Sequence, residues 1–275
     1  MRHGYDLLSD LVENNLNTLP SGRPNILLLG ASGGLGGALA AHYAQAGSHL
    51  ILLGRNTERL EELAQQCRVA GSTAEIQLCD LMQVEQAVSA LNDLDRRTPI
   101  DVAVFAAGQG DVRPAGSLVE SAELVQRLGT VNFVAQAAMA AALGERMAVR
   151  DGGKIVLVGS AASFHALPFA AAYSGSKAGL TRFADALRIG LGPHGVSVTL
   201  VSPGFIDTAA ARQVSGPKPM MMSPADAARR IADATEKGLA HVIMPWPFAL
   251  LRLLDRMLPH FLKDRLLRSL APPAD

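Results

Sequence analysis

The 275-residue chain has little cysteine, few aromatic residues and no excess of charge of either sign. Cys67 and Cys79 are the only cysteines, and neither lies in a Cys-x-x-Cys or His-rich pattern, which argues against a zinc site and favours reduced thiols. Lys plus Arg and Asp plus Glu each number 25, so the formal net charge is zero and nothing indicates nucleic acid as a partner. The seven histidines are scattered without metal-ligand spacing, so we expect no metal.

Long apolar runs are also missing. Residues 1–24 contain Asp6, Asp10 and Glu13 and no extended apolar stretch, unlike a signal peptide. No run approaches the ~18 apolar residues that a transmembrane helix needs. We therefore expect a cytoplasmic protein.

What the chain does contain is a regular alternation of short apolar runs and helical stretches. The run Ile26–Leu29 ends at Gly30 and is typical of a strand that is buried on both faces. Asn56 or Thr57, and Ser223 followed by a proline, are helix start signals. Strands are expected at 26–29, 49–53, 74–78, 102–105, 154–158, 197–201 and 241–244, with helices at 56–68, 82–95 and 170–190. Residues 120–147 are expected to be a long helical region, of one helix or two. This order predicts a single-domain α/β protein of the Rossmann type, a doubly wound parallel sheet of about seven strands with helices on both faces.

The two ends of the chain lie outside this pattern. Residues 1–24 are expected to be an extension with a short helix at 5–16, and residues 25–245 the main domain. Residues 246–275 form a C-terminal extension with two amphipathic segments, at 248–258 and 260–270, in which Arg and Lys lie opposite leucines. These segments could contact a membrane surface, pack on a partner subunit or cover the substrate cleft.

A glycine-rich loop follows the first expected strand. Residues 30–37 read Gly-Ala-Ser-Gly-Gly-Leu-Gly-Gly, and the next stretch is helical. Glycines allow a tight turn and a close approach of the backbone to phosphate, and the helix directs its free N–H groups at the same point. This strand–glycine–helix context predicts a dinucleotide-binding loop rather than a flexible turn.

A second pattern, Tyr173-x-x-x-Lys177, lies in the expected helix 170–190. Residues four apart on a helix share one face, and a nearby ammonium favours the phenolate. We therefore expect Lys177 to lower the pKa of Tyr173, which would act as a proton donor and acceptor.

The spacing Gly30-x-x-x-Gly34-x-Gly36, together with Tyr173-x-x-x-Lys177, resembles the short-chain dehydrogenase/reductase family over roughly residues 25–244. The resemblance implies four catalytic residues: Tyr173 as acid/base, Lys177 as its partner and ribose ligand, Ser160 as oxyanion stabiliser and Asn132 as part of a proton relay. The implied cofactor-binding residues also include Tyr173 and Lys177; the others are Gly30, Ser32, Gly33, Gly34, Leu35, Gly36, Arg55, Asp80, Leu81, Ala107, Gly108, Pro203, Gly204, Ile206 and Thr208. Ser163 remains a rival to Ser160, and Asn132 could instead bond a neighbouring loop.

Two positions depart from the family pattern. Leu29 stands where the family usually has Thr, and Ala106-Ala107-Gly108 replaces Asn-Asn-Ala-Gly, so local hydrogen bonding near the cofactor should differ. At the end of the second strand Gly54 occupies the usual acidic position and Arg55 follows. A guanidinium can bind a 2′-phosphate, so NADP(H) is the expected cofactor, unless Arg55 merely pairs on the next helix.

These features predict a reversible NADP(H)-dependent oxidoreductase acting on a carbonyl or secondary alcohol. His165, Leu167, Pro168 and Phe169 are expected to line the pocket. Residues 209–222, ending in three methionines, form either a mobile lid over an apolar substrate or an ordinary surface loop with core methionines. A non-catalytic NADP(H)-binding sensor or scaffold is the alternative; a sugar-nucleotide epimerase is disfavoured because its substrate domain is missing. By resemblance, a homodimer or homotetramer through the helices at 120–147 and 170–190 is expected.

Overall fold

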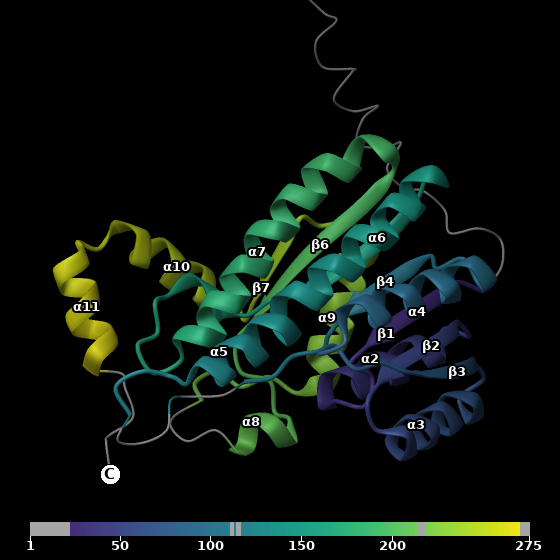
Figure 1. Ribbon diagram of the computed structural model, residues 1–275, viewed down its shortest axis with the longest axis horizontal. Helices are drawn as coiled ribbons and strands as arrows, with labels where there is room; N and C mark the ends of the chain where they lie inside the picture. Colours follow the sequence, from purple (N-terminus) through teal and green to yellow (C-terminus); the bar gives the residue numbers. More distant parts are fainter. Residues whose placement is uncertain (1–22, 111–112, 114–116, 214–217, 270–275) are drawn as a thin grey trace, which may run out of the picture.

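The computed structural model describes residues 23–110, 113, 117–213 and 218–269. Its centre is one seven-stranded parallel sheet in the order β3-β2-β1-β4-β5-β6-β7, which confirms the predicted fold (Figure 1). The strands are β1 (Asn25–Leu29), β2 (His49–Gly54), β3 (Thr73–Leu78), β4 (Val102–Phe105), β5 (Gly153–Val158), β6 (Val196–Pro203) and β7 (His241–Met244). The expected helix at 5–16 lies outside the described residues.

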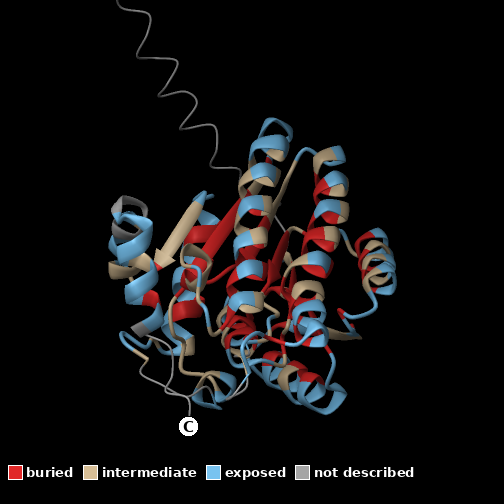
Figure 2. Ribbon diagram, turned by 60° about the vertical axis from the view of Figure 1, so that its left-hand side comes forward, coloured by how far each residue is buried: buried red, intermediate tan, exposed pale blue. Residues whose placement is uncertain are grey.

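Helices cover both faces of the sheet. One face carries α2 (Gly34–Gln45), α3 (Thr57–Val69) and α9 (Pro224–Glu236). The other carries α4 (Val84–Arg97), α5 (Ala122–Gly129), α6 (Ala135–Val149) and α7 (Ala171–Leu191). Figure 2 shows the central strands buried between helices whose outer sides are exposed. The start signals hold: Asn56 Oδ1 accepts from Arg59 N, and the Ser223 side chain accepts from Asp226 N.

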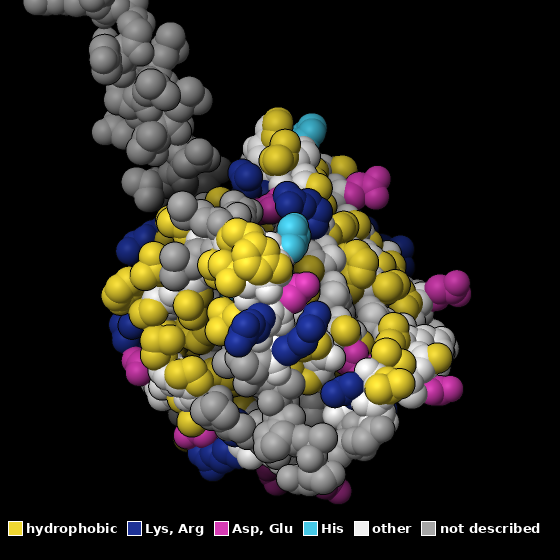
Figure 3. Space-filling view, turned by 90° about the vertical axis from the view of Figure 1, so that its left-hand side faces the viewer, with side chains coloured by type: hydrophobic (Ala, Val, Ile, Leu, Met, Phe, Trp, Pro, Cys, Tyr) yellow, Lys and Arg dark blue, Asp and Glu magenta, His cyan; other side chains and the backbone are white. Residues whose placement is uncertain are grey.

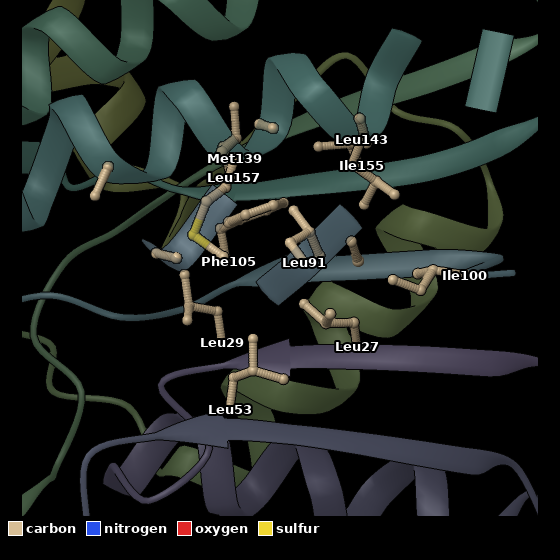
Figure 4. Close-up of a cluster of buried hydrophobic side chains, with 14 of the residues drawn as sticks. Leu27, Leu29, Leu53, Leu91, Ile100, Phe105, Met139, Leu143, Ile155 and Leu157 are labelled. Carbon is tan, nitrogen blue, oxygen red and sulfur yellow. The ribbon is translucent and has the colours of Figure 1, made fainter. Parts of the chain in front are cut away.

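The sheet is held by apolar side chains on both of its faces, as the continuous apolar runs predicted. In β1, Leu27 and Leu29 join the core under α4 and α6 (Figure 4). Ile26 and Leu28 join the core under α2. Successive side chains point to opposite faces of a strand, and helices cover both faces of the sheet, so all four are buried. Truncating one such leucine to alanine typically costs about 2–5 kcal/mol.

The helical region expected at 120–147 contains two α-helices, one of the two readings that the sequence left open, and an unpredicted π-turn joins them. It consists of α5, a π-helical turn η1 (Thr130–Val134) and α6. A π-turn widens the helix by one residue and is frequent at functional sites. Asn132, one of the expected catalytic residues, lies within this turn.

Four short or terminal elements follow the carboxyl ends of the last three strands. The 3₁₀ turn η2 (Ala161–Phe164) follows β5, and α8 (Ala209–Gln213) follows β6. After β7 come α10 (Pro247–Met257) and α11 (His260–Ser269), which lie at one side of the molecule (Figure 1). In the described part of the chain no helix is long and apolar enough to cross a membrane.

Candidate active site

The candidate site lies at the carboxyl ends of the strands, around the point where the strand order reverses between β1 and β4. Gly30 follows β1, Ala106–Gly108 follow β4, Ser160 follows β5 and Gly204 follows β6. Ligands of doubly wound sheets bind in the crevice outside such a reversal. The topology therefore brings the predicted cofactor and catalytic segments to one edge of the sheet.

The glycine loop is packed so closely that side chains would not fit. Gly30 has φ +85°, and a Cβ there would lie 2.7 Å from the backbone of Ala107. A Cβ on Gly36 would lie 2.2 Å from the Gly30 carbonyl oxygen, and one on Gly34 would lie 2.7 Å from the Thr208 side chain. The first-turn N–H groups of α2 lack partners within the helix, and no acidic residue occupies that turn. The loop thus fits a pyrophosphate.

Arg55 lies at the end of β2, next to this loop. Its side chain is exposed, and a Cβ on Gly54 would lie 3.0 Å from the Ser32 hydroxyl oxygen. The absence of a carboxylate at position 54 leaves Arg55 and Ser32 as polar groups at this edge. Asp80 is exposed after β3, where its carboxylate accepts from Met82 N at 3.0 Å, and Leu81 is buried beside it.

Tyr173 and Ser160 meet, although they come from different elements. Tyr173 lies in the first turn of α7, and Ser160 lies just before η2. The Ser160 side chain hydrogen-bonds the Tyr173 hydroxyl and also accepts from Ala162 N at 3.1 Å. Ser163, the rival, instead receives a hydrogen bond from the Thr181 hydroxyl at 3.3 Å. The geometry favours Ser160 as the partner of Tyr173.

Lys177 extends its ammonium into the same region. Its Nζ donates to the Val158 carbonyl at 2.9 Å, and it would lie 3.4 Å from a Cβ on Gly108. The residue is buried, and burial lowers the pKa of Lys177 to about 8. This ammonium therefore titrates close to neutral pH.

The expected direction of the Tyr173 pKa shift is wrong for this structure. Burial raises the pKa of Tyr173, and the hydrogen bond from Ser160 offsets only part of that rise. Desolvation disfavours the phenolate more than the neighbouring groups favour it. Tyr173 is thus held as a neutral phenol, and the group with a pKa near neutrality is Lys177.

Asn132 is fully buried and fastens the loop after β4 to α7. Its Oδ1 accepts from Gln109 N at 2.8 Å, while its Nδ2 donates to Gln109 O at 2.8 Å and to the Ser176 hydroxyl at 3.2 Å. A Cβ on Gly108 would lie 3.6 Å from Asn132 Oδ1, so Asn132 and Lys177 converge on Gly108. Its bond to a neighbouring loop is the alternative that the sequence left open, and its relay role stays a prediction.

Two polar residues that the sequence did not single out also support the site. Gln136 is fully buried, and its Nε2 donates to Ala107 O at 3.0 Å and to Val131 O at 2.8 Å. It thereby supports the loop in which Ala106 and Ala107 replace the family's asparagines. Gln136 lies four residues after Asn132, and this spacing on one helix face was the available signal.

Glu120 caps the helix that carries Tyr173. Both carboxylate oxygens lie 3.1 Å from Ala172 N, although the N-cap residue of α7, Ala170, makes no side-chain cap. A carboxylate at a helix N-terminus accepts an otherwise unpaired N–H and complements the helix dipole. No sequence signal indicates this contact, because Glu120 lies 52 residues away from Ala172.

The segment after β6 approaches the glycine loop. The Thr208 side chain lies where a Cβ on Gly34 would project. Pro203 ends β6, and Ile206 forms a β-bridge with Met222. Met222 N donates to Phe205 O at 2.9 Å, whereas Met220 and Met221 are exposed. Of the three methionines, Met222 is thus held by backbone hydrogen bonds, whereas the side chains of Met220 and Met221 are exposed. The mobile lid stays a prediction, and residues 214–217 of it lie outside the described residues.

The first C-terminal helix packs against the catalytic edge. A Cβ on Gly204 would lie 2.4 Å from the Phe248 ring, and the Arg252 guanidinium lies 4.8 Å from the centroid of the Phe164 ring. Arg252 Nη1 is 3.2 Å from His241 Nδ1, and His241 Nε2 is 2.9 Å from the Ser202 hydroxyl. α10 therefore packs on the loop after Ser160, and the three fates that the sequence left open for the C-terminal segments stay predictions. The expected wall residue His165 directly follows this loop and is partly buried.

Comparisons with known proteins agree with this geometry. The family model described as short chain dehydrogenase matches residues 24–218. An uncharacterized oxidoreductase of Myxococcus xanthus is 33% identical over 245 residues, covering 89% of this chain and 96% of that protein. Estradiol 17-beta-dehydrogenase 11 of Rattus norvegicus is 27% identical, covering 89% and 83%. A short-chain dehydrogenase from Sphingobium yanoikuyae in complex with NADPH superimposes with a TM-score of 0.76 at 26% identity, covering 92% and 98%.

The parallel sheet, the glycine loop at its reversal point and these matches define a nicotinamide-dependent oxidoreductase. The chain belongs to the short-chain dehydrogenase/reductase family.

Proposed function

We propose that the protein is an NADP(H)-dependent oxidoreductase that interconverts a carbonyl group and a secondary alcohol on an apolar substrate. The observation that carries this proposal is that Ser160 hydrogen-bonds Tyr173, while Lys177 places its ammonium against the Val158 carbonyl and beside Gly108, at the carboxyl ends of the strands. These groups supply an oxyanion donor, a proton donor and a cation within one site.

The residues present fit a nicotinamide dinucleotide. The close-packed loop Gly30–Gly36 would hold the pyrophosphate at the start of α2, and Thr208 would contact the nicotinamide end. Arg55, with Ser32 beside it, would hold a 2′-phosphate by charge-assisted hydrogen bonds. The NADPH complex of the Sphingobium relative supports this assignment. When bound, the cofactor supplies or accepts the hydride.

The proton chemistry follows from the burial of Tyr173. Because burial raises its pKa, Tyr173 is protonated at neutral pH and can donate its proton to the oxygen of a carbonyl that is being reduced. Ser160 hydrogen-bonds Tyr173 and would donate to the same substrate oxygen. Lys177, whose pKa is about 8, would then return a proton to Tyr173, and oxidation of an alcohol would reverse these steps.

Two aromatic side chains near the site support an apolar substrate. Phe164 and Phe248 lie next to the loops that follow Ser160 and β6. Aromatic and aliphatic walls with few polar groups favour an apolar ketone, aldehyde or alcohol. The name of the rat relative, an estradiol dehydrogenase, supports this class of substrate.

The test is a panel of apolar ketones and aldehydes offered with NADPH deuterated at nicotinamide C4. We expect deuterium at the carbinol carbon of at least one product, and slower turnover with NADH. NADPH binding without deuterium transfer to any member would instead support the non-catalytic sensor. Failure to bind NADPH at all would contradict both.

The oligomeric state is part of the proposal. A homodimer or homotetramer through the α5–α6 region and α7 follows from the family resemblance, and Val125, Val134 and Ile189 are exposed apolar residues in that region. Sedimentation velocity on the purified chain should show a dimer or tetramer; a monomer at micromolar concentration would contradict this.

A further inference from the structure

The helix α10 exposes several leucines and turns an arginine inward, unlike an ordinary surface helix. Phe248 and Arg252, four residues apart on one face, point inward to Gly204, Phe164 and His241. Leu250 and Leu253, on another face, are exposed, the latter by 55%. A helix that covers a globular protein normally buries its apolar stripe and exposes its charged one. Here the described part of the protein leaves Leu250, Leu251 and Leu253 uncovered.

The exposed apolar surface continues beyond α10. Trp246 before the helix is 73% exposed, and Phe261 in α11 is 71% exposed, with Leu258 and Leu262 also exposed nearby. Figure 3 looks onto this side of the molecule and shows hydrophobic side chains gathered next to Lys and Arg side chains. Contiguous apolar patches with a polar rim mark interaction sites.

The charge of this segment distinguishes between the candidate occupants. Residues 246–268 contain five Lys and Arg and two Asp, a net charge of +3, whereas the whole chain has a net charge of zero. A second copy seated on this surface would place like charges against each other, which is unfavourable. An anionic bilayer instead attracts Lys and Arg while it accepts leucine, tryptophan and phenylalanine side chains at the interface.

We propose that the apolar face of α10 and α11 is a docking surface for an anionic lipid bilayer. The protein would lie on the membrane without crossing it, with Trp246, Leu253 and Phe261 in the interface and Arg265 and Arg268 near lipid headgroups. The inward face of α10 would stay fixed to the catalytic edge through Arg252 and Phe248. This surface is separate from the cofactor and proton-transfer residues, so the proposal does not rest on the proposed reaction.

The test uses the full-length protein and sedimentation with lipid vesicles. We expect binding to vesicles of phosphatidylcholine with phosphatidylserine, weaker binding to phosphatidylcholine alone, and a loss of binding as salt is raised. The double variant Leu253→Glu/Phe261→Glu should reduce the partition coefficient by at least about tenfold. A matched control, Val69→Glu/Val149→Glu, introduces the same charges at exposed apolar residues of α3 and α6 and should bind like the wild type.

A second variant controls for the possibility that the glutamates unfold α10 or α11. Arg265→Gln/Arg268→Gln keeps the apolar face and should weaken binding to the phosphatidylserine vesicles specifically. No binding of the wild type to either vesicle, or equal binding by all variants, would overturn the proposal. A dimer that Leu253→Glu/Phe261→Glu dissociates, without vesicle binding by the wild type, would also overturn it and assign the face to a second copy.

Discussion

At the scale of single residues, the site depends on how burial sets the state of two titratable groups. Burial raises the pKa of Tyr173 and lowers the pKa of Lys177 to about 8. The Tyr-x-x-x-Lys spacing placed both groups on one helix, but it could not give the direction of the Tyr173 shift. Desolvation depends on the tertiary surroundings of the phenol, and the Ser160 side chain that bonds it comes from the segment after β5 rather than from α7.

The lowered pKa of Lys177 has a consequence for stability. Between pH 8 and the ordinary lysine value, the unfolded state holds a proton that the folded state has lost, so the free energy of unfolding gains a contribution that rises with pH. Below pH 8 the cost of burying the ammonium is present in full. We expect Lys177→Met to raise the melting temperature at pH 7. The variant should also lack the rise in the free energy of unfolding that the wild type shows above pH 8.

Calorimetry at pH 7 and pH 10 measures both effects. Lys237→Met, at an exposed lysine, serves as the matched control and should behave like the wild type. If Lys177→Met lowers the melting temperature at pH 7 and keeps the alkaline gain, the described burial of the ammonium is wrong.

Arg55 determines the cofactor preference in this account. Arg55→Glu should weaken NADPH binding by at least about tenfold and leave NADH binding within a few-fold, because only NADPH carries the 2′-phosphate. Isothermal titration of both cofactors measures this. Arg97→Glu, at the far end of α4, makes the same charge change away from the site and should leave both affinities unchanged. An equal loss for NADPH and NADH would refute the assignment.

At the scale of elements, helix starts and distant contacts place the catalytic groups. Asn56 and Ser223 were readable as N-caps because the capping side chain and its helix are adjacent in sequence. The cap of α7 was not readable, because Glu120 reaches it from a separate segment. The π-turn around Asn132 was missed for a related reason: nothing in Thr130–Val134 marks a break in the helix, and the hydrogen bonds of Asn132 to Gln109 and Ser176 come from distant segments.

The cap from Glu120 gives a prediction about turnover. Glu120→Ala should lower the free energy of unfolding by about 1 kcal/mol and also reduce turnover, because it loosens the first turn of α7 next to Tyr173. Ser121→Ala removes the neighbouring cap of α5, whose side chain accepts from Leu124 N, and is the matched control. Ser121→Ala should lower the free energy of unfolding by a similar amount and leave turnover unchanged. Denaturant titration and steady-state kinetics measure the two effects, and equal turnover in both variants would show that the cap does not position Tyr173.

At the scale of the whole molecule, the sequence was sufficient to predict the parallel sheet and the glycine loop at the carboxyl end of its first strand. The apolar runs that start with Ile26–Leu29 and the glycine spacing are local signals, and both match the described fold. The docking of α10 was left open, because its pattern shows that it is amphipathic but not which face is inward. Arg252 points inward only because Phe164 and His241, from distant segments, provide its contacts.

A buried ion network joins the helical layer on one face of the sheet. Asp95 of α4, with no exposed side-chain surface, lies 2.7 Å from Arg150 and 2.5 Å from Arg146, and it accepts from Ile100 N at 2.9 Å. Burial raises the pKa of Asp95, but the hydrogen bonds from Arg150, Ile100 and Arg146 outweigh it and the pKa is lowered. This stabilisation is present above the ordinary carboxyl pKa and is lost as pH falls through the lowered folded value.

Asp95→Asn should therefore lower the free energy of unfolding by about 3–5 kcal/mol at pH 7, with less difference from the wild type in acid. Asp93→Asn, at an exposed carboxylate on the same helix, should change it by less than about 1 kcal/mol. Urea titrations at pH 7 and pH 3 measure both. A difference between Asp95→Asn and the wild type that does not shrink in acid would contradict the ionised network.

The most direct test of the central claim separates proton transfer from cofactor binding at Tyr173. Tyr173→Phe keeps the ring and removes only the hydroxyl that Ser160 bonds. We predict that turnover with NADPH and an accepted carbonyl falls by at least about a thousandfold, while the NADPH dissociation constant changes by less than about threefold. Turnover within about tenfold of the wild type would contradict the assignment of Tyr173 as the acid/base.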